Sequence, residues 1–163
     1  MKVAFVYPGI IGIGYNSYHA NLGEAESLPI YAIALLAGVI KQHGHEVELI
    51  DLRQMASEQM LIDRLRASTA EVISVSIQTP SFNVACRVAE LAKQFGKITL
   101  AGGIHATVAP EDFSQPYWDH VIKGDGEIIL PQLLEGFAKG EAFDRVIDGP
   151  WMEDLDDLPL PHY

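Results

Sequence analysis

The chain is poor in cysteine and in positive charge. Among its 163 residues Cys86 is the only cysteine, so no disulfide can form within the chain, which is typical of a reducing compartment. A single thiolate also cannot supply the cysteine ligands that an iron–sulfur cluster usually takes. The 11 lysines and arginines stand against 22 acidic residues, for a net charge of −11. This balance argues against a nucleic acid partner, whose phosphates would need to be neutralised.

The sequence also lacks a long apolar run. The segment from Ile30 to Ile40 covers only about half of the roughly 20 residues that a membrane-spanning helix needs. Residues 1–7 resemble a strand, and the charged, apolar and small-residue regions of a signal peptide do not follow. We therefore expect a cytoplasmic protein without a membrane span.

What the chain does contain is an alternation of short apolar strands and amphipathic helices. Runs of β-branched and apolar residues predict strands buried on both faces, and apolar residues three or four apart predict the helices between them. Ser57 is expected to cap one helix, Gly44 and Gly96 to end two others, and Pro131 to break the last helix near its start. The predicted strands are residues 2–7, 47–52, 72–77, 98–101 and 120–123. The first predicted helix starts at Pro29, and the other three cover residues 58–66, 84–95 and 127–138.

This alternation predicts an α/β fold of the Rossmann-like or flavodoxin-like kind. We expect an open parallel sheet with strand order 2-1-3-4-5 and helices on both faces. In that order a ligand crevice opens between the first and third strands, at their carboxyl ends. The loop over residues 10–28 is unusually long, which favours a functional role. Residues 1–140 are expected to form the domain, and the acidic, proline-containing residues 141–163 a linker.

Paired glycines at the end of the fourth predicted strand are the strongest indication of a ligand. Gly102 and Gly103 leave the main chain bare for a flat ligand, although a tight turn with positive φ also needs glycine. The turn over residues 124–127 offers backbone N–H groups at the same edge, as any helix N-terminus would. Ser76 lies in the third predicted strand and converges on the same edge.

Other possible signals are weaker. Gly9, Gly12 and Gly14 have the order G-x-x-G-x-G, but the lysine of a phosphate loop is missing, so this stretch does not predict a phosphate site. Asp51, at the end of the second predicted strand, could contact a ribose. No two of the six histidines have the i, i+4 spacing of a helical zinc site. His105 alone lies at the predicted edge, where we expect a polar contact to a ligand and not metal coordination. No catalytic or metal-binding residue is predicted.

Four segments, in order along the chain, resemble the N-terminal cobalamin-binding domain of B12-dependent radical S-adenosylmethionine (SAM) proteins. They are residues 28–47, with the Gly-His-Glu-Val exit of a helix; residues 73–76 with Thr79; the run GGIHATVAPE at 102–111; and GDGE at 124–127. Residues 155–161 (LDDLPLP) are similar to the family's linker into its catalytic barrel.

The resemblance implies a Rossmann-like domain that lays the corrin of cobalamin on the carboxyl edge of its sheet. It implies a 4Fe–4S cluster and SAM only in a missing C-terminal radical SAM barrel, the expected partner, because the C-x-x-x-C-x-x-C motif is absent here. Methyl transfer, cyclisation and rearrangement stay open as the reaction. The implied cofactor-binding residues are Ser76, Thr79, Gly102, Gly103, His105, Thr107, Gly124, Gly126 and Glu127.

One departure from the family concerns the cobalt. Many B12 domains carry Asp-x-His-x-x-Gly after the first strand, whereas residues 7–14 contain no histidine. The corrin is therefore expected to bind without an axial histidine from the protein. Two alternatives stay open: a flavodoxin-like domain for FMN or another nucleotide, and a degenerate docking module that has lost its cofactor.

Overall fold

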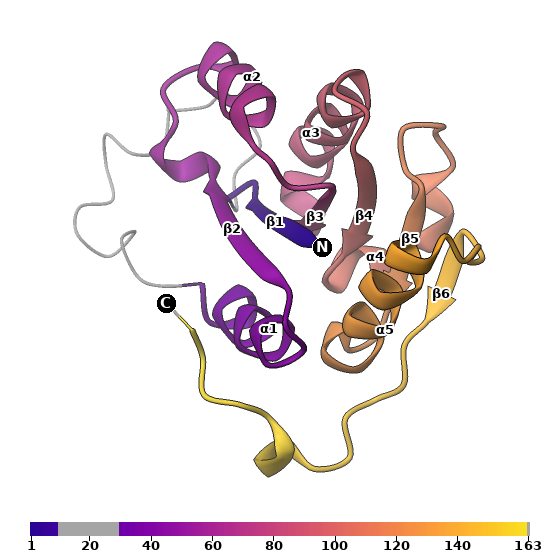
Figure 1. The fold of residues 1–163 in the computed structure, drawn as a ribbon. Helices are drawn as coiled ribbons and strands as arrows, with labels where there is room; N and C mark the ends of the chain where they lie inside the picture. Colours follow the sequence, from indigo (N-terminus) through magenta and orange to yellow (C-terminus); the bar gives the residue numbers. More distant parts are fainter. Residues whose placement is uncertain (10–29, 163) are drawn as a thin grey trace.

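A computed structural model describes residues 1–9 and 30–162 and shows a parallel sheet between two layers of helices (Figure 1). The long loop expected at residues 10–28, with Gly12 and Gly14, lies outside the described residues. The strand order β2-β1-β3-β4-β5-β6 confirms the predicted order and adds a sixth strand. The strands are β1 (Lys2–Tyr7), β2 (Glu46–Asp51), β3 (Val72–Ser76), β4 (Ile98–Gly102), β5 (His120–Lys123) and β6 (Val146–Asp148).

The sixth strand lies within the segment expected to be a linker. It pairs in parallel with β5, with Val121 opposite Val146 and Lys123 opposite Asp148. With only three residues at the edge of the sheet, β6 has no alternating pattern long enough to be recognised in the sequence. The sheet therefore extends past the domain boundary expected at residue 140.

The helices α1 (Tyr31–Gln42) and α5 (Gly126–Lys139) cover one face of the sheet, and α2 (Glu58–Ala67) and α3 (Phe82–Gln94) cover the other (Figure 1). Successive side chains of a strand point to opposite faces, so Ala4 and Val6 of β1 pack with α2 and α3, whereas Val3 and Phe5 pack with α1 and α5. In the described part of the chain no helix is long and apolar enough to cross a membrane. The shorter helices are α4 (Ile104–Val108) and the 3-10 helices η2 (Leu52–Gln54), η3 (Thr79–Ser81), η4 (Pro110–Phe113) and η5 (Leu155–Asp157).

Ser57, Gly44 and Gly96 mark helix ends as predicted. The predicted helix start at Pro29 lies outside the described residues, and α1 begins at Tyr31 after Ile30 in extended backbone. The Ser57 hydroxyl accepts a hydrogen bond from an amide of the first turn of α2, and Gly44 and Gly96 follow α1 and α3 with φ of +76° and +69°. The expected break at Pro131 is wrong, because α5 runs through it. A proline in the second turn gives up one hydrogen bond, to the carbonyl of Glu127, and the buried face of α5 outweighs that loss.

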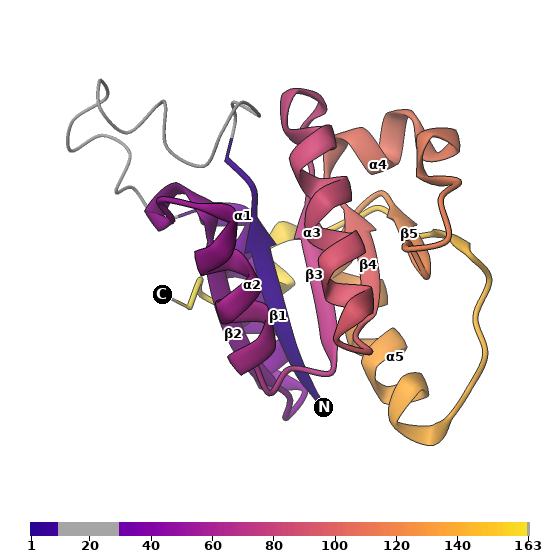
Figure 2. The same cartoon turned by 90° about the horizontal axis from the view of Figure 1, so that it is seen from above.

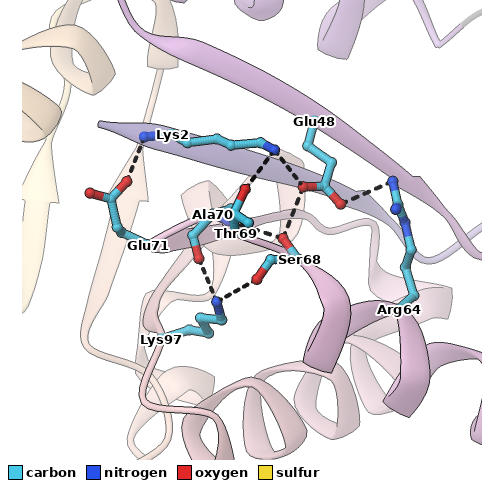
Figure 3. A network of polar contacts seen from close by, with 8 residues as sticks. All are labelled: Lys2, Glu48, Arg64, Ser68, Thr69, Ala70, Glu71 and Lys97. Carbon is cyan, nitrogen blue, oxygen red and sulfur yellow. Dashed lines mark hydrogen bonds and ion pairs between the residues drawn. The ribbon is translucent and has the colours of Figure 1, made fainter.

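A network of polar contacts joins β1, β2, α2 and the segment before β3 (Figure 3). The side chain of Glu48 is 9% exposed and lies 3.3 Å from Lys2 Nζ and 2.9 Å from a nitrogen of Arg64. The Ser68 hydroxyl donates to the same carboxylate, and Lys97 Nζ donates to the Ser68 carbonyl at 2.8 Å. These contacts tie the elements together away from the carboxyl ends of the strands.

The C-terminal segment runs around the side of the sheet on which α1 and α5 lie, as its yellow trace shows (Figure 1). The amide of Met152 donates to an oxygen of Asp125 at 2.8 Å, and the amide of His162 donates to a carbonyl of α1 at 2.8 Å. A Cβ on Gly38 would lie 2.7 Å from the carbonyl oxygen of Leu160. A glycine in α1 thus allows the returning chain to lie directly against the helix.

Candidate functional site

The loops that follow β3, β4 and β5 meet at the carboxyl edge of the sheet. Ser76 and Gly102 are paired as the last residues of β3 and β4, and α4 lies beyond these strand ends (Figure 2). The hydroxyl of Thr107 in α4 donates to the Gly103 carbonyl at 3.1 Å and accepts from the Gly124 amide at 3.1 Å. The structure therefore brings together the two glycine segments that the sequence singled out.

The paired glycines differ in what surrounds them. Gly103 has φ +91°, and a Cβ there would lie 2.8 Å from both the amide nitrogen and the carbonyl oxygen of Ile77. The protein uses these two groups, because the Ile77 amide donates to the Gly102 carbonyl and its carbonyl accepts from the His105 amide. A Cβ on Gly102 would meet no described atom closer than 4.0 Å, at the Val75 carbonyl. Gly103 thus serves the protein's own backbone, whereas Gly102 could carry a Cβ without collision.

The glycines of the second segment also serve close packing. Gly124 has φ +77°, and a Cβ there would lie 2.8 Å from the Gly149 carbonyl beyond β6. A Cβ on Gly126 would lie 3.3 Å from a methyl carbon of Leu36 in α1. The amide of Gly124 is already bonded to Thr107. The segment therefore shapes the edge of the sheet.

Glu127 lies partly buried in the first turn of α5. Burial raises the pKa of its carboxyl, the negative charge of Asp125 acts in the same direction, and a hydrogen bond from the backbone amide of Glu127 opposes them. The positive end of the helix dipole favours the ionised form, so burial is the larger effect. Two adjacent carboxyl groups make this helix start unfavourable for a free phosphate group.

His105 lies in the interior beside the site. Its side chain is 7% exposed, and its ring centroid lies 4.7 Å from that of Phe82 and 5.6 Å from that of Phe113. Its Nδ1 lies 3.1 Å from the hydroxyl oxygen of Thr79. Its Nε2 lies 3.2 Å from Asp112 Oδ2, a contact without hydrogen-bond geometry. Thr79 and Asp112 are both exposed, so His105 is the buried member of this group and supports the Thr79 hydroxyl from below.

The sequence reasoning missed an exposed apolar pair at this edge. Ile104 and Val108 lie one turn apart on α4, directly after the paired glycines, and are 61% and 64% exposed. Their i, i+4 spacing around the buried residues His105 and Ala106 was the available signal. Large exposed apolar side chains beside a bare stretch of main chain suit a ligand with an extensive apolar face.

Two further residues weighed in the sequence have internal roles. Asp51 is 7% exposed and binds Arg53 through Nη2–Oδ2 at 2.7 Å and Nε–Oδ1 at 3.0 Å. The guanidinium carbon lies 5.0 Å from the centre of the Tyr7 ring, so the buried carboxylate is engaged by an arginine that is itself held by the fold. Burial raises the pKa of the Cys86 thiol, as expected for an unreactive core cysteine.

Comparison with known proteins identifies the family. Residues 25–134 match the B12 binding domain family, and the chain belongs to it. An uncharacterized methyltransferase of Pyrococcus horikoshii is 23% identical over 154 residues, which cover 83% of this chain and 33% of the relative. An uncharacterized methyltransferase of Synechocystis sp. is 26% identical over 166 residues, which cover 100% of this chain and 30% of the relative. The chain thus spans about a third of the length of these relatives.

Solved structures show the same fold. The radical SAM methyltransferase TsrM from Kitasatospora setae, with cobalamin and a [4Fe-4S] cluster bound, superimposes with a TM-score of 0.69 at 19% identity, over 86% of this chain and 27% of that chain. The cobalamin-dependent SAM radical enzyme OxsB, with aqua-cobalamin bound, gives a TM-score of 0.63 at 21% identity, over 87% of this chain and 19% of that chain. The predicted likeness to the cobalamin-binding domains of radical SAM proteins is confirmed, as is the Rossmann-like fold.

Proposed function

We propose that this chain is the cobalamin-binding part of a larger radical SAM enzyme that transfers a methyl group. The observation that carries the proposal is that Gly102 could hold a Cβ without collision at the carboxyl ends of β3 and β4, where the loop after β3 also exposes Thr79. The names of the relatives as methyltransferases support methyl transfer over cyclisation or rearrangement. Bound cobalamin would supply a cobalt centre that can carry a methyl group.

The residues at the edge fit a large flat cofactor, because a side chain on Gly102 would fill the space that such a ligand needs. We assign direct contacts to Ser76, Thr79 and Gly102, with Ile104 and Val108 beside the apolar part of the ring. The remaining predicted residues act indirectly in this proposal: Gly103, Gly124 and Gly126 permit the close backbone approaches, Thr107 joins the loops, His105 supports Thr79, and Glu127 adds a carboxyl at the rim.

We also propose that the cobalt has no axial histidine from this chain. His105 is buried against Thr79 and Asp112, and residues 7–14 contain no histidine. His19 lies outside the described residues, so the test includes His19→Ala. Electron paramagnetic resonance of the Co(II) form should show no splitting from an imidazole nitrogen, either in the wild-type chain or in His19→Ala. Imidazole splitting that His19→Ala or His105→Ala removes would overturn the proposal.

A C-terminal radical SAM domain of the same protein is the partner we propose. It would hold the 4Fe–4S cluster and SAM, as the lengths of the relatives and the bound groups in TsrM suggest. Because β6 pairs with β5, we place the connection towards that domain after Asp148 and not after residue 140.

Retention of hydroxocobalamin tests the function. The purified chain is incubated with hydroxocobalamin or with FMN and desalted, and visible spectra are recorded. We expect near-stoichiometric corrin absorbance, no FMN, and loss of corrin in Gly102→Val but not in the distant surface variant Asp63→Asn. Retention of FMN alone would support the flavodoxin-like alternative, and retention of neither would support the docking module.

A further inference from the structure

We infer that Asp112 and His105 fix the direction of the Thr79 hydroxyl, so that Thr79 presents only an oxygen acceptor to the cofactor. This oxygen selects an N–H donor, such as a primary amide on the corrin rim, over a phosphate oxygen. The inference rests on the proposed cobalamin site. It states which partner donates the hydrogen bond in one contact of that site, the one made by the Thr79 hydroxyl.

The arrangement is built from three separate segments. Thr79 starts η3, His105 lies in α4, and Asp112 lies in η4. The His105 ring joins them, with Nδ1 3.1 Å from Thr79 Oγ1 and Nε2 3.2 Å from Asp112 Oδ2. Packing between Phe82 and Phe113, and the bond from the His105 amide to a carbonyl after β3, hold the ring in this orientation.

The charge of Asp112 decides which ring nitrogen carries the proton. A neutral imidazole has one N–H and one lone pair in the ring plane. A lone pair on Nε2 would be repelled by the carboxylate 3.2 Å away, so the proton belongs on Nε2. Nδ1 is then an acceptor, and the hydrogen that bridges the 3.1 Å to Thr79 is that of the hydroxyl.

A hydroxyl has one hydrogen, and here the Thr79 hydroxyl donates it in a hydrogen bond to His105 Nδ1. Thr79 is exposed, and we infer that the remaining lone pairs of its Oγ1 are accessible to a ligand. They can accept from an N–H group but cannot donate to a phosphate or carboxylate oxygen. Corrin-rim amides carry N–H groups, whereas a phosphate offers only acceptors. The group therefore favours the corrin amides over the phosphate of a nucleotide.

The proton position is tested without any ligand. Nitrogen-15 NMR of the histidine-labelled protein at neutral pH should show His105 with Nε2–H and an unprotonated Nδ1. The same spectrum of Asp112→Asn should show an appreciable Nδ1–H population, because the biasing charge is gone. A protonated Nδ1 in the unmodified protein, as the other tautomer or as imidazolium, would overturn the inference.

Binding tests the consequence for the cofactor. Hydroxocobalamin should bind about three- to tenfold more weakly to Thr79→Val, which keeps the shape of the side chain, and within about twofold of wild type to Thr79→Ser. Asp112→Asn, remote from the proposed contact, should weaken binding about threefold but add nothing in the Thr79→Val background. Full additivity, or unchanged binding in both single variants, contradicts the inference.

A modified cofactor identifies the group that is recognised. The three cobalamin monocarboxylic acids each replace one rim amide by a carboxylate. At least one should bind wild type about tenfold more weakly than hydroxocobalamin does, and Thr79→Val should abolish that difference. Equal penalties in both proteins would contradict the inference. A wild-type chain that binds no corrin would instead refute the proposed function, while the NMR result would still decide the direction of the hydroxyl.

Discussion

A methyl group on Gly103 would lie 2.8 Å from both the amide nitrogen and the carbonyl oxygen of Ile77. A methyl group on the adjacent Gly102 would lie 4.0 Å from the Val75 carbonyl oxygen, which is an ordinary van der Waals contact without collision. Two neighbouring glycines therefore have different reasons to lack a side chain: Gly103 lets the exits of β3 and β4 bond to each other, and Gly102 leaves room above the sheet.

Alanine substitutions should separate these two roles. Gly103→Ala should lower the free energy of unfolding by about 2–4 kcal/mol, because it combines a positive φ with a backbone collision. Gly102→Ala should change it by less than about 1 kcal/mol and should instead weaken hydroxocobalamin binding. Urea denaturation and equilibrium dialysis measure the two effects. Equal destabilisation by both variants would contradict this division.

Asp119 should make the fold sensitive to acid. Burial alone would raise the pKa of Asp119, but hydrogen bonds from Lys93 and Thr99, with the charge of Lys93, hold it below its usual value. The folded state then binds protons less readily than the unfolded chain, so the stabilisation is complete above about pH 4 and is lost as the pH falls through the lowered pKa.

Asp119→Asn should accordingly cost about 1–2 kcal/mol at pH 7. The difference from wild type should shrink as the pH falls below about 4, measured by urea denaturation over a pH series. Asp63→Asn is the control, since Asp63 and Arg66 form an exposed i, i+3 pair that should be worth less than about 0.5 kcal/mol. A constant difference at every pH would refute the charge-based explanation.

Glu127 should behave in the opposite way. Its pKa is raised, first by burial and then by Asp125, so the folded state holds the proton more tightly than the unfolded chain does. This contribution is present at low pH and is lost as the pH rises through the raised pKa. Glu127→Gln should therefore melt at a higher temperature than wild type at pH 7 and at the same temperature near pH 3.5. A lower melting temperature at pH 7 would show that the helix dipole prevails.

Gly38→Ala should detach the C-terminal segment from α1. Alanine favours a helix by about 1 kcal/mol over glycine, but its methyl group would collide with the Leu160 carbonyl at 2.7 Å. In a chain truncated after residue 149, the same substitution should be purely stabilising. Faster chymotrypsin cleavage next to the exposed Trp151 would report detachment in the full chain. Unchanged cleavage would show that the helix can shift to accommodate the methyl group.

Much of the fold is predictable because its signals are local. The five longer strands and the four long helices have apolar periods that a window of the sequence reveals, and Ser57 and Gly96 mark helix ends by their own chemistry. The strand β6 is not predicted from the local sequence, because its three edge residues form a strand only through pairing with β5. Pro131 misleads because the packing that keeps α5 intact comes from distant residues.

The site is predictable only in part for the same reason. The glycine pair and Thr79 stand out in the sequence, but the different roles of Gly102 and Gly103 depend on Ile77, which is remote along the chain. The burial of His105 depends on Phe82 and Phe113, from two other segments. Which side chains face outward is decided by packing between segments, and that information is absent from any single motif.

The carboxylate of Glu48, held by Lys2, Arg64 and Ser68, has a practical consequence for engineering. Its cluster secures the scaffold at a distance from the loops that would receive a ligand. Libraries that randomise Thr79, Ile104 and Val108 therefore leave this anchorage untouched, and altered selectivity for corrinoid analogues can be sought without first redesigning the framework.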